Sequence, residues 1–160
     1  MTILKRWFAP IILAIAMVAG GTQPASAFLD KTRFVLHLGV AYFCFHHWVM
    51  APYQAGAFAA GAPHRTSTIV KGGIALLFAV HEVHVAQEIA AKSNDPLLKK
   101  LNGEVVALSG SFLAIGQRLR AGHFNPSDIS ALEGQAKSLG SDASANGVNI
   151  KDVPIAVPGT

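Results

Sequence analysis

The chain has 160 residues, of which 51% are hydrophobic, and a formal net charge of +4. This length suits a single domain. The basic residues are scattered and do not interleave with aromatic residues, so the composition argues against a nucleic-acid-binding protein. Cys44 is the only cysteine, which excludes an intramolecular disulfide and a zinc site of paired cysteines. We expect it to be a buried, inert thiol.

Residues 1–27 have the three parts of a secretory signal peptide in the correct order. Lys5 and Arg6 form a basic start, the apolar run WFAPIILAIAMVAG follows, and Ala25-Ser26-Ala27 is an A-x-A cleavage pattern. We therefore predict cleavage near Ala27 and a secreted or periplasmic protein. An uncleaved membrane anchor is the alternative.

Residues 28–50 predict the first helix of the mature chain. Asp30 suits an N-cap, and the length of the apolar run favours a helix over a strand. His37 lies on the face that we expect to pack against a neighbouring helix. His46 and His47 lie near the C-terminal end, where we expect them to meet solvent.

A second, very apolar helix is predicted over residues 67–91, after a Gly- and Ala-rich loop. It is interrupted by His81, His84 and Glu88. At about 100° per residue, these three side chains fall in the sector of several large apolar residues of the same helix. We therefore expect them to face the interior, where unpaired polar groups are costly.

The third helix is predicted over residues 96–121, with Asp95 as its N-cap and Pro96 at its first position. Glu104 falls within its apolar stripe and is a second carboxylate where the pattern requires an apolar residue.

Gly72-Gly73 lies near the start of the second predicted helix. The two glycines weaken that helix but permit close approach by a neighbouring helix.

A weaker fourth helix over residues 128–139 completes the predicted fold. The Ser-, Asn-, Gly- and Pro-rich residues 140–160 predict an extended, flexible C-terminal tail. The fold class is therefore all-α: a small irregular three- to four-helix bundle after a signal peptide, with a helical domain over residues 28–139.

Three of these helices bring titratable side chains to positions that we expect to face inward. Helix bundles build metal sites from His and Glu on facing helices, and these ligands suit a transition metal. The predicted metal ligands are His81, His84, Glu88 and Glu104. A haem held by His37 with His81 or His84 is a second interpretation. Such a haem would be non-covalent, because no CxxCH motif is present. Alternatively, these His and Glu side chains satisfy one another across helix interfaces.

We therefore predict an exported small helical protein that acts by binding or interaction rather than by catalysis. Its cofactor is not specified beyond a transition metal or haem, and a protein partner or a homo-oligomer is expected. We assign no catalytic residue. The alternatives are a membrane-associated haem or redox electron-transfer protein with two apolar spans, and a metal-dependent enzyme.

Overall fold

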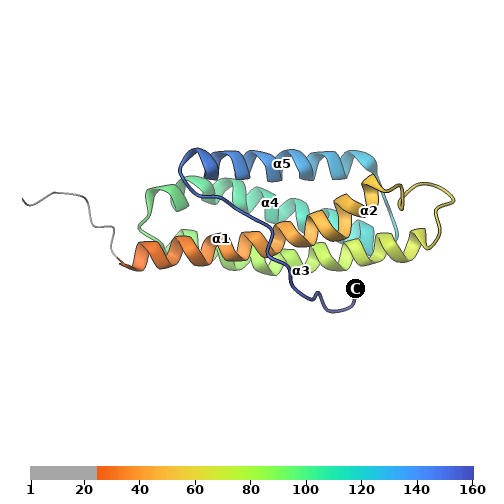
Figure 1. Ribbon diagram of the computed structural model, residues 1–160, viewed down its shortest axis with the longest axis horizontal. Helices are drawn as coiled ribbons and strands as arrows, with labels where there is room; N and C mark the ends of the chain where they lie inside the picture. The colour runs from red at the N-terminus through yellow and green to blue at the C-terminus, as the bar shows by residue number, and fades with distance from the viewer. Residues whose placement is uncertain (1–24) are drawn as a thin grey trace, which may run out of the picture.

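The computed structural model describes residues 25–160, whose regular structure is entirely helical (Figure 1). One continuous helical stretch comprises α1 (Ala25–Phe45), the π-helix η1 (His46–Met50) and α2 (Ala51–Gln54). The other helices are α3 (Arg65–Lys92), α4 (Pro96–Arg120) and α5 (Pro126–Ala145). Apart from Ala25–Ala27, which begin α1, the predicted signal peptide lies outside the described residues.

The long helices run up and down alternately and form an antiparallel bundle (Figure 1). α3 packs against both α1 and α4, and α5 packs on α4. Phe45 of α1 and Phe112 of α4 are fully buried, with ring centroids 6.0 Å apart. The prediction of an all-α bundle is confirmed.

Glycines set the close approach of α3 to its neighbours. A Cβ on Gly73 would overlap the backbone of Arg120 in α4, and one on Gly72 would lie 3.0 Å from the carbonyl oxygen of Trp48. Gly116 of α4 faces Gly73, and a Cβ on Gly116 would lie 3.1 Å from the Cβ of Leu76. The close approach expected at Gly72-Gly73 is thus confirmed on both sides of α3.

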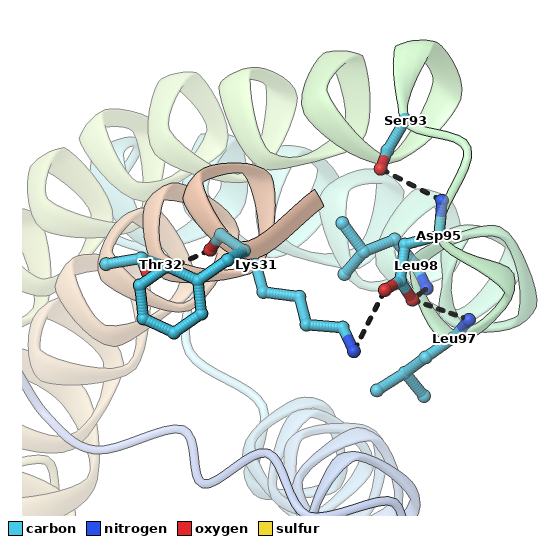
Figure 2. Close-up of polar contacts among 7 residues, drawn as sticks. Lys31, Thr32, Ser93, Asp95, Leu97 and Leu98 are labelled. Carbon is cyan, nitrogen blue, oxygen red and sulfur yellow. Dashed lines mark hydrogen bonds and ion pairs between the residues drawn. The ribbon is translucent and has the colours of Figure 1, made fainter. Parts of the chain in front are cut away.

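The turn between α3 and α4 is fixed by one buried carboxylate, that of Asp95. It accepts hydrogen bonds from the backbone N–H groups of Leu97 (2.9 Å) and Leu98 (3.3 Å), which confirms the predicted N-cap. Figure 2 shows Lys31 reaching from α1 to the same carboxylate, with Nζ 2.9 Å from Oδ2. Asp95 therefore joins α1 to the start of α4.

The fourth long helix, α5, continues beyond the predicted end at residue 139. Asn125 caps it by accepting from the N–H of Ser127, and it ends only at Ala145. Buried Ala143 prolongs the stripe of Leu132 and Leu139. The extension was not predicted because Gly, Ser and Ala residues obscure the periodicity of this stretch.

Residues 146–160, the C-terminal segment, leave α5 and cross the outer side of α1 toward α3 (Figure 1). The N–H of Val153 donates to the carbonyl oxygen of Gly39 (3.0 Å), and Val157 is buried. A Cβ on Gly39 would overlap the carbonyl oxygen of Lys151, so only glycine leaves room for this crossing. The segment covers the side of α1 that the helices leave open, and residues 38–42 are consequently all buried. Its predicted flexibility stays a prediction.

Two helical stretches are long and apolar enough to cross a membrane, by length and composition alone: Ala25–Gln54 and Arg65–Lys92. In the bundle, 56% and 44% of their most apolar windows are buried by other parts of the chain. Helices that are apolar all round are typical of protein cores as well as of membranes.

Candidate functional site

The structure does not bring the four predicted metal ligands together. His84 and Glu88 form a solvent-exposed pair on α3, with Nε2 3.2 Å from Oε1 and side chains 60% and 52% exposed. His81 is also exposed. Within residues 25–160, no group of three or more His, Cys, Asp or Glu residues is placed to hold a metal ion.

The orientation of α3 explains why these side chains do not face inward. Its buried face consists largely of small residues, including Gly72, Ala79, Ala86 and Ala90, which allow close packing. Ile74 and Leu77, two large apolar residues in the sector that we expected to face the interior, are only half-buried. Because α3 is apolar on nearly every side, its large residues do not mark the face that packs.

Glu104 lies at the α4–α5 interface, away from the α3 histidines. Burial and, after it, the neighbouring Asp142 carboxylate raise the pKa of Glu104. Glu104 also lines a hollow of about 100 Å³ with Gln135. Glu104 Oε2 and Gln135 Oε1 are buried without a hydrogen-bond partner among the described residues. The sequence identified an unusual carboxylate here, but not its neighbours.

His37 pairs with Glu82, and not with His81 or His84. Its Nδ1 lies 2.7 Å from Glu82 Oε2, and the two side chains are 25% and 14% exposed. This contact joins α1 to α3 and agrees with the alternative that His and Glu side chains satisfy one another across an interface. It offers a haem no second histidine.

A groove of about 690 Å³ lies between the first helical stretch, α5 and the C-terminal segment. We call it the α1–α5 groove. Its volume falls within the range of small-molecule sites. The residues that line it include Tyr42, His46, Met50, Ala136, Ile150 and Asp152.

His46 and Asp152 form a pair at this groove. His46 Nδ1 lies 2.8 Å from Oδ1 and 2.9 Å from Oδ2 of Asp152. A carboxylate can only accept, so His46 Nδ1 carries the proton that it donates to Asp152. The side chains are 44% and 40% exposed, so His46 is half exposed to solvent, as its place near the helix end predicts, and is also paired.

The π-helix η1 begins at His46 and widens the helical stretch at the groove. Single π-helical turns are frequent at functional sites. His47, the next residue, is exposed and stacks on Phe43 with centroids 5.0 Å apart. The two adjacent histidines therefore have different surroundings, and only His46 lines the groove.

Tyr42 fixes the floor of the groove. Its hydroxyl donates a hydrogen bond to the carbonyl oxygen of Ala136 in α5 (2.6 Å). Burial first, and then the nearby Glu104 and Asp152 carboxylates, raise the pKa of Tyr42, so the phenol stays protonated. Gly140 lies beside it, and a Cβ there would be 3.7 Å from the Tyr42 hydroxyl oxygen, an ordinary contact.

Sequence reasoning missed the partner of His46 because it treated residues 140–160 as a flexible tail. A usable signal is present: Val148, Ile150, Val153, Ile155 and Val157 recur almost every second residue and all pack against the core. Such alternation is typical of an extended segment with one buried face.

The chain was also compared with known proteins. No protein-family model, curated protein or solved structure matches it.

Proposed function

We propose that this chain is an exported binding protein whose small-molecule ligand occupies the α1–α5 groove. The observation that carries the proposal is the groove itself, where Tyr42 and the pair of His46 with Asp152 of the C-terminal segment lie beside an apolar floor. A few polar groups placed on a mostly apolar hollow are typical of ligand sites.

The groove supports binding better than catalysis. It contains a His–Asp pair, but none of the residues that line it is Ser, Thr or Cys, so no serine or threonine hydroxyl and no cysteine thiol is there for the histidine to activate. Tyr42 is held as a hydrogen-bond donor to Ala136, and its raised pKa opposes a role as a base. These groups are suited to orienting a ligand.

Export is supported by the signal-peptide pattern of residues 1–27. The two-span alternative has less support, because charged residues lie against the middle of the stretch Ala25–Gln54. The backbone of Lys151 lies beside Gly39, and the carboxylate of Asp152 pairs with His46. Charged groups at the centre of a bilayer are costly.

A rim substitution tests whether a ligand occupies the groove. Ala51 is exposed and lines the groove, so Ala51→Trp should fill part of it without entering the core. Decanoate, a ten-carbon carboxylate, serves as the probe ligand. Its binding should raise the Tm of the full chain, and Ala51→Trp should weaken that binding about tenfold or more, since a tryptophan excludes the ligand from its contacts. Thermal unfolding over a decanoate titration measures both effects.

Ala114→Trp is the matched control, because Ala114 is exposed on α4 outside the groove. It should leave binding unchanged. Equal binding by both variants, or no binding of decanoate and its neutral and cationic analogues by the parent chain, would contradict the proposal. A Soret band or stoichiometric metal in the purified protein would instead favour the haem or metal interpretation.

A further inference from the structure

We infer that the ligand of the α1–α5 groove is a single-chain amphipathic monoanion, such as a medium- or long-chain carboxylate. The inference rests on the proposed function and specifies the class of ligand.

The charges at the groove leave one cation without a partner. Of the charged side chains that line it, Asp152 is bound by His46, and Glu133 lies 2.6 Å from Lys137 Nζ. Lys151 is exposed and forms no ion pair with any residue of the part of the chain that the structure describes. A ligand with one negative charge would complement this arrangement, whereas a cation would meet an uncompensated lysine.

The floor of the groove requires an apolar body in the same ligand. Met50 and Ala136 are buried and Ile150 is partly buried, and all three line the groove. Methionine is flexible and adapts to ligands of irregular shape. A small inorganic anion would leave this surface uncovered, and a neutral hydrocarbon would not use Lys151.

The backbone at Lys151, one of the residues that line the groove, is held in place. The Lys151 carbonyl oxygen lies directly over Gly39, and two residues later Val153 donates to the Gly39 carbonyl oxygen. A lysine is a compact point charge on a flexible stem, so it suits one anionic head group without demanding a fixed two-point geometry.

The test compares three ten-carbon ligands that differ only in the head group: decanoate, 1-decanol and decylammonium. Calorimetric titration of the full chain should give the tightest binding for decanoate. Lys151→Gln should weaken decanoate binding about three- to tenfold, the range for one partly exposed charge contact, and leave 1-decanol binding unchanged. Lys99→Gln, at an exposed lysine outside the groove, should change neither.

The outcomes separate the inference from the proposed function. If 1-decanol or decylammonium binds as tightly as decanoate, or if Lys151→Gln binds decanoate like the parent chain, the inference is wrong while the groove remains a binding site. If none of the three ligands binds, the proposed function fails with it.

Discussion

At the scale of single residues, Asp95 shows how a buried charge can be stabilised by its contacts. Its side chain is 1% exposed, and burial alone would raise its pKa. The hydrogen bonds from Lys31 and from the backbone N–H groups of Leu98 and Leu97 outweigh burial, so the pKa of Asp95 is lowered. The carboxylate is therefore charged in the folded state over the whole neutral range.

Replacing Asp95 should destabilise the fold in a pH-dependent way. Asp95→Ala removes the N-cap and the partner of Lys31, and we expect it to lower the free energy of unfolding by about 1–3 kcal/mol at pH 7. Because the folded pKa is lowered, this contribution is present above the unfolded pKa of about 3.9 and is lost as pH falls through the folded pKa. Urea titrations at pH 7 and in acid measure the difference.

The conservative variant separates the cap from the charge. Asp95→Asn keeps an oxygen that can accept from Leu97 and Leu98, so it should be less destabilising than Asp95→Ala at pH 7. It should also approach the stability of the parent chain in acid. A stability loss in Asp95→Ala that is equal at both pH values would argue against the charged contact.

At the scale of elements, the C-terminal segment explains the composition of α1. A surface helix normally keeps one polar side, yet residues 38–42 are buried in succession. The segment covers α1 where α3 and α5 do not, and it contributes Ile150, Lys151 and Asp152 to the groove. Groove and segment therefore form together.

Substitution of Gly39 should displace this segment. A Cβ there would overlap the carbonyl oxygen of Lys151 and lie 2.7 Å from Cγ2 of Val153. In Gly39→Ala we expect the Val153 amide to lose its hydrogen bond to residue 39 and to exchange with solvent at least about tenfold faster, because local opening becomes easier. Decanoate binding should weaken as well. Amide hydrogen exchange resolved by residue measures the first effect.

Gly134→Ala is the matched control in α5, because a Cβ on Gly134 would meet nothing within 4 Å. It should stabilise the protein by about 0.5–1 kcal/mol, the usual gain at an open helical site. It should not increase the rate at which the Val153 amide exchanges through local opening. Unchanged exchange at Val153 in Gly39→Ala would show that the segment is not held at this glycine.

At the scale of the whole molecule, the features that local patterns determine were predictable. The Asp95 cap and the close approach at Gly72-Gly73 each follow from a few adjacent residues. The all-α class follows from the length of the apolar runs. The partners of the titratable side chains were not, because they depend on how helices rotate against one another. His46 and Asp152 are far apart in the chain and meet only once the C-terminal segment crosses α1.

The proposed ligand site lies between the first helical stretch, α5 and the C-terminal segment. Backbone and side-chain NMR shifts of the full chain, recorded during a decanoate titration, test it most directly. The shifts should concentrate at Tyr42, His46, Ala136, Ile150 and Lys151, all of which line the groove. Shifts centred instead on the exposed His81 and His84 side of α3, or no shifts at all, would contradict it.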